Sequence, residues 1–384
     1  MYLGKVMTIF GTRPEAIKMA PVVKELKKVV DIDTKVVVTA QHREMLDQVL
    51  QLFSIQPDYD LDLMKQQQDL FSITCGVLEG MKDILEKERP DLVLVHGDTT
   101  TTMAASLAAF YARIPVGHVE AGLRTRNKYS PYPEEMNRTL TGRIADLHFA
   151  PTDTSRENLL HEATARFKIW VTGNTVIDAL LETVEQAYEF GPEFAGIDFG
   201  KRLLVVTTHR RENWGEPMRE IYRALIDLVE EFPDVEAVFP VHKNPVVRDV
   251  ARELLEGRER IHLLEPLEYQ PFANLLKASY LVLTDSGGLQ EEAPSLGKPV
   301  LVLRDTTERP EAVQAGTVKL VGTNRKRVYK EAHLLLADAD EYNKMARAIN
   351  PYGDGKAARR IAKVITEYLY SRLGARGETL GQRE

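Results

Sequence analysis

Cysteine is nearly absent from this sequence: Cys75 is the one cysteine among 384 residues. A single cysteine cannot form a disulfide within the chain, and such sparse use is typical of a reducing compartment. Because Cys75 stands in an apolar helical stretch, we expect it to be a buried packing residue and not a nucleophile.

Long apolar runs are missing as well. No stretch approaches the roughly 18 uninterrupted apolar residues that a membrane span requires. Met1–Lys5 leads directly into a short predicted strand and has none of the features of a secretory signal. We therefore expect a soluble, cytoplasmic protein without a membrane segment.

Neither sign of charge is in large excess, since 50 basic residues stand against 57 acidic ones and the net charge is −7. This sign opposes non-specific binding to nucleic acid or to an anionic membrane. Metal-ligand spacings are also lacking: there is no H-E-x-x-H run and no cysteine pair, and the nine histidines are scattered. The sequence thus predicts neither a nucleic-acid partner nor a metal site.

Two common phosphate-binding motifs are missing or misplaced. The chain has no G-x-x-x-x-G-K-[ST] run, which argues against an NTPase. Its G-x-G-x-x-A match, Gly353–Ala358, follows Asn-Pro-Tyr and not a strand, which argues against a nicotinamide site. We expect no bound cofactor.

What the sequence does contain is a regular alternation of short β-rich runs with longer helical patterns, typical of parallel α/β layers. The segment Phe190–Gly200 holds glycines and a proline between two such series, and we interpret it as an interdomain connection or a loop beside one. The fold class predicted is α/β, with two doubly wound, Rossmann-like units facing a central cleft. The predicted strands are Val6–Phe10, Lys35–Thr39, Leu92–His96, Val116–Val119, Leu147–Ala150, Ile169–Val171, Leu203–Thr207, Ala237–Phe239, Ile261–Leu264, Leu281–Thr284, Val300–Leu303 and Lys319–Val321.

Two strand-to-helix loops look suited to anions, because ligands of open parallel sheets bind beyond the carboxyl ends of the strands. The first loop carries Arg13 at a helix start, where a phosphate would be favoured. The second is Thr284–Gly288, whose glycines allow backbone N–H groups to approach a phosphate, while Ser286 is expected to cap the next helix. On that helix, Glu291 or Glu292 could accept hydrogen bonds from ribose hydroxyls. Each loop could equally be an ordinary helix start.

Carboxylates stand at two successive predicted strand ends, Asp98 and Glu120, and a further pair, Glu134 and Glu135, opens a helix. Each has a plain structural interpretation as a helix cap, a loop charge or a first-turn acid. Together they favour acid–base chemistry, because clustered carboxylates raise one another's pKa. In the second half, His209 and Arg210 stand at one strand end and His242 at another, which suits a phosphate leaving group.

Taken together, these loops resemble the non-hydrolysing UDP-N-acetylglucosamine 2-epimerases, bacterial type. The resemblance runs in order along almost the whole chain. The matching segments are FGTRPEAIKMAP (10–21), HGDTTTT (96–102), GHVEAGLRT (117–125), PEEMNRTLTG (133–142), GNTVIDAL (173–180), HRREN (209–213), TDSGGLQEEAPSLGKPVL (284–301), RDTTERPEA (304–312) and NPYGDG (350–355).

The resemblance implies a fold like that of GT-B glycosyltransferases, with domains over 1–172 and 173–356 and a final helix, 357–384, packing back on the first domain. It implies reversible interconversion of UDP-GlcNAc and UDP-ManNAc for cell-surface polysaccharide, in a homodimer. Four catalytic positions match Asp98, Glu120, Glu134 and His209. The positions that hold UDP match Arg13, Lys18, Phe272, Ser286, Gly287, Gly288, Glu292 and Arg309.

Some bacterial members bind a second UDP-GlcNAc as an activator, at positions that Gln41, Arg210 and His242 resemble. Such members can carry a further glutamine three residues past Gln41, where this chain has Glu44. Four alternatives stay open from the sequence. They are a 2-epimerase of another UDP-2-acetamido sugar, a hydrolysing epimerase, a GT-B glycosyltransferase and a non-catalytic nucleotide-sugar sensor.

Overall fold

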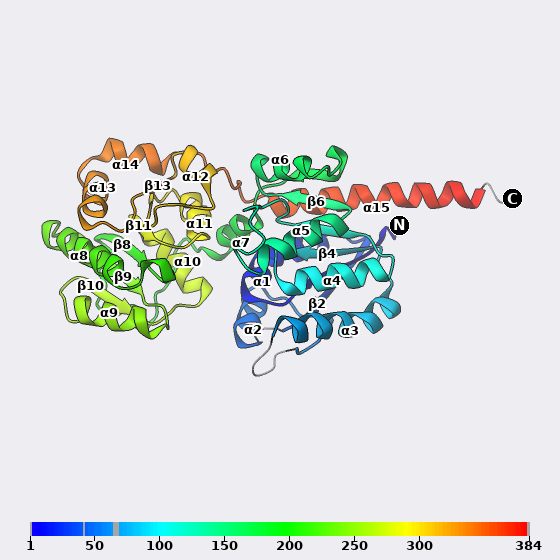
Figure 1. Cartoon of the computed structure of the whole chain (residues 1–384), viewed down its shortest axis with the longest axis horizontal. Helices are drawn as coiled ribbons and strands as arrows, with labels where there is room; N and C mark the ends of the chain where they lie inside the picture. The colour runs from blue at the N-terminus through cyan, green and yellow to red at the C-terminus, as the bar shows by residue number, and fades with distance from the viewer. Residues whose placement is uncertain (1, 41–42, 64–68, 382–384) are drawn as a thin grey trace. The chain divides into compact units, whose positions relative to one another are not determined.

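The computed structural model describes residues 2–40, 43–63 and 69–381. It consists of two compact units, each with its own parallel sheet (Figure 1). The first unit comprises Met1–Ala179 and Gly353–Glu384, and the second comprises Leu180–Tyr352. Helix α7 (Thr175–Thr183) carries the chain from the first unit to the second.

The first unit has a seven-stranded sheet of order β3-β2-β1-β4-β5-β6-β7, in which every recorded pairing is parallel. This order is the doubly wound one, in which the chain reverses direction across the sheet between β1 and β4. The strands are β1 (Gly4–Phe10), β2 (Ile32–Val38), β3 (Tyr59–Asp60), β4 (Leu92–His96), β5 (Val116–Val119), β6 (Leu147–Ala150) and β7 (Ile169–Val171).

Helices flank this sheet, and the last helix of the chain, α15, packs against α1 (Figure 1). Their starts follow from local sequence. Thr12 caps α1 in a capping box with Glu15, and Thr99 caps α4 by accepting a bond from the Thr102 N–H. The helices are α1 (Arg13–Lys27), α2 (Arg43–Leu52), α3 (Leu70–Glu88), α4 (Thr100–Tyr111), α5 (Glu134–Ile144), α6 (Asp153–His161) and α15 (Ala357–Gly381), with a 3₁₀ turn at Arg166–Lys168.

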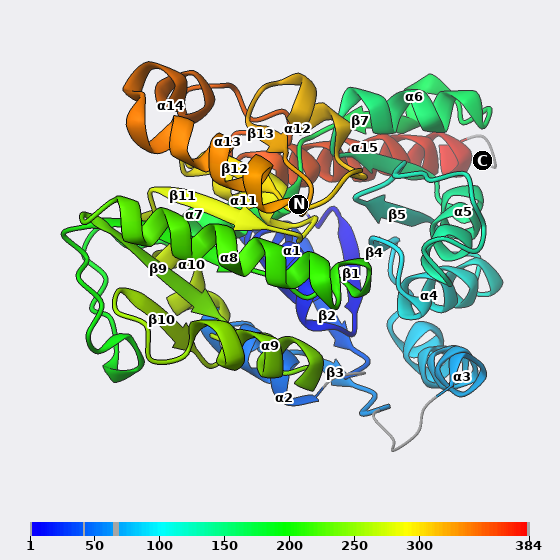
Figure 2. The ribbon, with the colours of Figure 1, turned by 60° about the vertical axis from the view of Figure 1, so that its left-hand side comes forward.

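The second unit has a six-stranded sheet of order β10-β9-β8-β11-β12-β13, again with parallel pairings. One face is covered by α8, α9 and α13, whose apolar residues join those of the strands in one buried core (Figure 2). The strands are β8 (Arg202–Thr207), β9 (Val235–Pro240), β10 (Ile261–Leu264), β11 (Leu281–Thr284), β12 (Val300–Val302) and β13 (Val318–Leu320). The helices are α8 (Glu216–Glu231), α9 (Pro245–Leu255), α10 (Tyr269–Ala278), α11 (Leu289–Ser295), α12 (Pro310–Gln314), α13 (Arg325–Ala337) and α14 (Ala339–Ala346), with 3₁₀ turns at Pro192–Phe194 and Arg211–Asn213.

The prediction of an α/β fold built from two doubly wound sheets is confirmed, and details of the sequence analysis need correction. Cys75 is exposed and not buried, because it projects from the side of α3 opposite to the buried Ile73 and Val77. The two-residue strand β3 was not predicted, since two residues carry no recognisable period. Of the two interpretations of Phe190–Gly200, the interdomain connection is wrong, because the segment lies wholly inside the second unit, where Phe190 stacks on Phe199.

Among the described residues, no helix combines the length and the apolar character needed to cross a membrane.

Candidate active site

The structure brings together the three acids predicted for catalysis, all in the first unit. Strands β4 and β5 are neighbours, with His96 aligned to Val119. Asp98 follows the first of these strands and Glu120 the second, while Glu134 is the first residue of α5. Glu120 and Glu134 both act electrostatically on Asp98, so the three carboxylates form one group.

Asp98 stands out electrostatically within this group. Loss of hydration raises its pKa to about 6, and the negative charges of Glu120 and Glu134 act in the same direction. Arg138 and Lys18 oppose this rise. The plain interpretation of Asp98 as a helix cap is wrong, because Thr99 caps α4. A carboxyl with a pKa near neutrality can both take and give a proton.

Glu120 is held by cationic and polar neighbours from distant parts of the chain. Its Oε1 accepts bonds from Lys18 Nζ at 2.5 Å and from Asn174 Nδ2 at 2.8 Å. Its backbone φ is +63°, which is uncommon for a residue with a side chain and is typical of functional sites. Lys18, which the resemblance placed at UDP, therefore also contacts the group of acids predicted for catalysis.

His96 is a buried neighbour of this group that the sequence analysis did not single out. Its Nε2 lies 3.5 Å from Glu120 Oε2. Burial lowers its pKa to about 4, so the ring is neutral at pH 7. Neither ring nitrogen has a hydrogen-bond partner within the described part of the chain.

Arg13 occupies the first position of α1, where the predicted anion site lies. The loop before it is fixed by Glu15, a buried carboxylate that the sequence analysis treated only as part of the motif. Glu15 accepts bonds from the Gly11 and Thr12 N–H groups at 3.0 and 2.8 Å. It also accepts a bond from the Thr99 hydroxyl at 2.6 Å, and so joins the Arg13 loop to the loop that carries Asp98.

In the second unit, His209 is oriented by Asp285, a fully buried carboxylate whose role the sequence analysis missed. Asp285 Oδ1 lies 2.9 Å from His209 Nδ1. The carboxylate also accepts bonds from the backbone N–H groups of His209 and Arg210 and from Asn213 Nδ2. Burial alone would raise the pKa of Asp285, but the bond from His209 and these N–H groups lower it below its usual value. Asp285 is therefore an anion that fixes the imidazole.

The glycine loop that begins next to Asp285 precedes α11. Ser286 does not cap this helix as expected: the N-cap is Gly288, without a side-chain cap bond. The Ser286 hydroxyl is thus not used as a cap, while the Gln290 and Glu291 N–H groups at the start of the helix bond to the carbonyls of Gly287 and Gly288. A Cβ at Gly287 would lie 2.8 Å from Glu308 Oε1, the end of a flexible side chain that would have to shift.

The other residues assigned to UDP lie around the same loop. Arg309, the N-cap residue of α12, pairs through Nε with the buried carboxylate of Glu291. Glu292 accepts a bond from the Tyr269 hydroxyl at 3.4 Å. Phe272 lies on α10, one turn after Tyr269.

Two of the three residues matched to the activator site lie near His209. Arg210 Nη2 donates to Glu308 Oε1 at 3.3 Å, and the His242 ring stacks on that of His209 with a centroid distance of 5.8 Å. Desolvation, followed by the charge of His209, lowers the pKa of His242. Gln41 lies outside the described residues.

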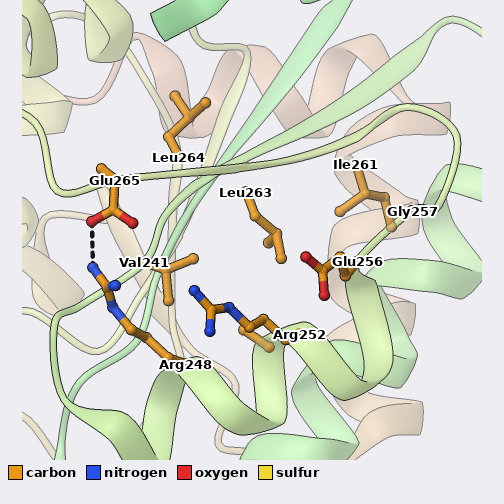
Figure 3. A pocket seen from close by; sticks show the side chains of 10 residues that line it. Val241, Arg248, Arg252, Glu256, Gly257, Ile261, Leu263, Leu264 and Glu265 are labelled. Atoms are coloured by element: carbon orange, nitrogen blue, oxygen red, sulfur yellow. Dashed lines mark hydrogen bonds and ion pairs between the residues drawn. The ribbon is translucent and has the colours of Figure 1, made fainter.

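A hollow of about 290 Å³ elsewhere in the second unit has none of the predicted residues in its lining (Figure 3). It lies between α9 and the edge strand β10, where Arg248 pairs with Glu265 over an apolar floor that includes Leu263. Its size does not make it the reactive site, because the acids and the glycine loop lie elsewhere.

Comparison with known proteins places this geometry in a family. The family model described as UDP-N-acetylglucosamine 2-epimerase matches residues 24–366. A UDP-N-acetylglucosamine 2-epimerase of Bacillus subtilis (strain 168) is 59% identical over 361 residues, 94% of each chain. The structure of UDP-GlcNAc 2-epimerase from Neisseria meningitidis bound to UDP-GlcNAc is 52% identical, with a TM-score of 0.84 over 94% of this chain and 100% of that one. A glycotransferase of kitacinnamycin, 11% identical with a TM-score of 0.65 over 95% of this chain and 99% of that one, shares the fold alone.

Proposed function

This chain belongs to the UDP-N-acetylglucosamine 2-epimerase family, and we propose that it reversibly interconverts UDP-GlcNAc and UDP-ManNAc by inverting C2 of the sugar. The observation that carries this proposal is the group formed by Asp98, Glu120 and Glu134, in which one carboxyl has its pKa raised to about 6. Such a group suits removal of a proton from one face of C2 and its return to the other.

The chemistry of the sugar dictates the route. The hydrogen on C2 is not adjacent to a carbonyl, so its direct abstraction is very unfavourable. In the proposed route, UDP leaves C1 as the C2 proton is removed, which gives a 2-acetamidoglucal and UDP. A proton is then added at C2 from the opposite face, and UDP adds back to C1. Atoms and charge balance without any further reactant.

The carboxylates of the first unit would act at C2. Inversion needs a base on one face and an acid on the other, so at least two of Asp98, Glu120 and Glu134 take part. Lys18 beside Glu120 would stabilise negative charge on that carboxylate. The individual proton transfers are left open among the three.

The second unit would hold the leaving group. As the C1–O bond breaks, the pyrophosphate becomes more negative, and preorganised donors stabilise that charge most where water is excluded. Ser286, Gly287 and Gly288 would supply such donors, while His209, fixed by Asp285, would donate a proton or a hydrogen bond. Arg13, on the first unit, and Arg309 would add positive charge, and Phe272 and Glu292 would contact the nucleoside.

Three finer assignments belong to the same proposal. A second UDP-GlcNAc would activate the enzyme through Gln41, Arg210 and His242, so turnover of UDP-ManNAc alone would be slow and would rise on adding a trace of UDP-GlcNAc. The product would supply ManNAc-type residues for cell-surface polysaccharide. The enzyme would act as a homodimer, which light scattering would test.

The decisive experiment is incubation with UDP-GlcNAc in deuterated water, without an acceptor, followed by NMR. We expect UDP-ManNAc that carries deuterium at C2. Unlabelled UDP-ManNAc would exclude the elimination route, and free ManNAc would indicate a hydrolase. Absence of any reaction would favour another UDP-2-acetamido sugar or a GT-B glycosyltransferase.

A further inference from the structure

Next to the proposed catalytic Glu134 stands a second carboxylate, Glu135, that the proposed reaction does not use. It is 3% exposed, on the first turn of α5. Its oxygens accept bonds from the Thr125 N–H at 3.0 Å and from the Arg126 N–H at 2.7 Å. Burial alone would raise the pKa of Glu135, but these bonds and the charge of Arg138 lower it below its usual value. The residue is therefore a buried anion at neutral pH.

One turn further along α5, Arg138 lies between this anion and Asp98. Its Nε donates to Glu135 Oε2 at 2.9 Å, and its Nη1 lies 3.3 Å from Asp98 Oδ2. The Arg138 side chain is 9% exposed and that of Glu135 is 4% exposed, so their contact is buried, while Asp98, at 33%, is partly open to water. Asn137, the residue before it, donates to the Asp98 backbone carbonyl at 3.0 Å, which fixes the loop against the helix.

From this chain of contacts we infer that Glu135 is a positioning residue: it holds Arg138 against Asp98 and shares its positive charge, and so sets the charge that Asp98 carries during the reaction. The inference rests on the proposed function in one respect, the assignment of Asp98 to proton transfer.

Four charged groups act most strongly on Asp98. Arg138 and Glu134 face it from α5, Glu120 from the end of β5 and Lys18 from α1. Among the charges that lower the pKa of Asp98, Arg138 has the largest effect. If Arg138 stood alone, its full charge would favour the Asp98 carboxylate. Because Glu135 neutralises part of that charge, Asp98 keeps a pKa near 6 and can still be protonated at neutral pH.

Two substitutions should therefore move the Asp98 titration in opposite directions. Glu135→Gln removes a negative charge but keeps an oxygen for the Thr125 and Arg126 N–H groups, and we expect the Asp98 pKa to fall by about half a unit or more. Arg138→Gln removes the opposing cation, and we expect a rise of similar size. If Glu135 only anchored the loop, Glu135→Gln would lower activity without moving the Asp98 pKa. The Asp98 pKa would then not shift in opposite directions in Glu135→Gln and Arg138→Gln.

The matched control uses a second arginine–glutamate pair close by in sequence, in which the arginine is buried and the glutamate is half-buried. Arg124 is bound by Glu162 through bonds of 2.7 and 2.9 Å. Among the described residues, no hydrogen bond or ion pair joins Arg124 or Glu162 to Asp98 or Arg138, whereas Glu135 reaches Asp98 through Arg138. Glu162→Gln removes the same charge, and we expect it to leave the Asp98 titration in place.

The titration is read directly, by NMR of protein with ¹³C-labelled aspartate carboxyls, and in parallel from the pH dependence of kcat. The signal missing from Asp98→Asn identifies Asp98. Opposite shifts in Glu135→Gln and Arg138→Gln support the inference, and unchanged or parallel shifts overturn it. If Glu135→Gln does not fold, Glu135→Asp replaces it. Its shorter side chain holds the negative charge further from Arg138, so the Asp98 signal should shift in the same direction.

Full turnover by Asp98→Asn would refute the proposed function. The NMR shifts would still decide whether Glu135 sets the charge of Asp98.

Discussion

The contact between Asp285 and His209 yields the sharpest test of the proposal that the second unit stabilises a leaving UDP. The Asp285 carboxylate lies 2.9 Å from His209 Nδ1. The proton is thereby kept on Nδ1, which leaves Nε2 to exchange a proton with the phosphate, and the carboxylate stabilises positive charge on the ring. Asp285→Asn keeps the shape of the side chain but removes this charge and presents an N–H₂ group that favours the wrong tautomer.

The expected loss can be worked from the geometry. A carboxylate and an imidazolium about 4 Å apart interact by about 4 kcal/mol at an effective dielectric constant near 20. The His209 side chain is 35% exposed, and water screens the pair, so about 2 kcal/mol is a lower estimate. At 1.36 kcal/mol for each factor of ten, kcat should fall by roughly 30-fold to 10³-fold in Asp285→Asn.

The assay is the initial rate of C2 inversion at saturating UDP-GlcNAc, with UDP binding by calorimetry and the melting temperature measured alongside. Those two controls matter because Asp285 also accepts bonds from the Arg210 N–H and from Asn213, and so shapes the loop. The decisive comparison is a double-mutant cycle with His209→Asn. If Asp285 acts through His209, the double variant should be about as slow as His209→Asn alone.

Two results would refute this reasoning. One is a kcat for Asp285→Asn within about threefold of the unchanged enzyme, since the geometry requires at least about 2 kcal/mol. The other is a double variant in which the two losses multiply, because independent effects would mean that the carboxylate does not work through the imidazole.

Three further predictions follow from the same structure. Asp98→Asn should abolish turnover and leave UDP binding largely intact by calorimetry, and near-normal turnover would remove Asp98 from the mechanism. Gly287→Ala places a methyl group 2.8 Å from Glu308 Oε1; we expect UDP affinity to fall by about tenfold with the melting temperature nearly unchanged, and unchanged affinity would count against the phosphate loop. Burial lowers the pKa of His118 to about 3, so the stability it contributes is complete above its unfolded pKa, near 6.5, and is lost as the pH falls toward 3. Between pH 6 and 4, the unfolding free energy of His118→Gln should therefore fall less steeply than that of the unchanged protein, by about 1.4 kcal/mol per pH unit. Urea titrations at several pH values measure this, and an equally steep fall with pH in both proteins would contradict it.

The sheets and the strand-end residues could be predicted from sequence because parallel strands are buried on both faces. Runs such as Leu92–His96 and Leu281–Thr284 are therefore continuously apolar and end abruptly at polar residues. Since ligands bind beyond those ends, Asp98 and Ser286 could be singled out without any coordinates.

Besides His96, sequence reasoning missed the roles of two buried carboxylates whose partners lie far away in the chain. Glu15 meets Thr99 across 84 positions, and Asp285 meets His209 across 76. In sequence each has an ordinary local interpretation, as a capping-box acid or a loop aspartate. That interpretation explains the residue fully, so nothing in the sequence indicates a distant partner. The side of α3 on which Cys75 lies was missed for a related reason, since an apolar helical stretch does not by itself indicate which side is covered.

Four buried carboxylates explain how the proposed site can be both charged and fixed in place. Removing a carboxylate from water costs several kcal/mol, so a buried one needs partners that compensate for it. Here Glu15 is matched by the N–H groups before Arg13, Glu135 by Arg138 beside Asp98, Asp285 by His209, and Glu291 by Arg309. Glu135 and Glu291 each neutralise part of the charge of an arginine, Asp285 orients His209, and Glu15 fixes the backbone before Arg13. A reaction in which UDP must leave and then return requires donors that are rigid but only partly neutralising, and carboxylates placed behind those donors meet both requirements.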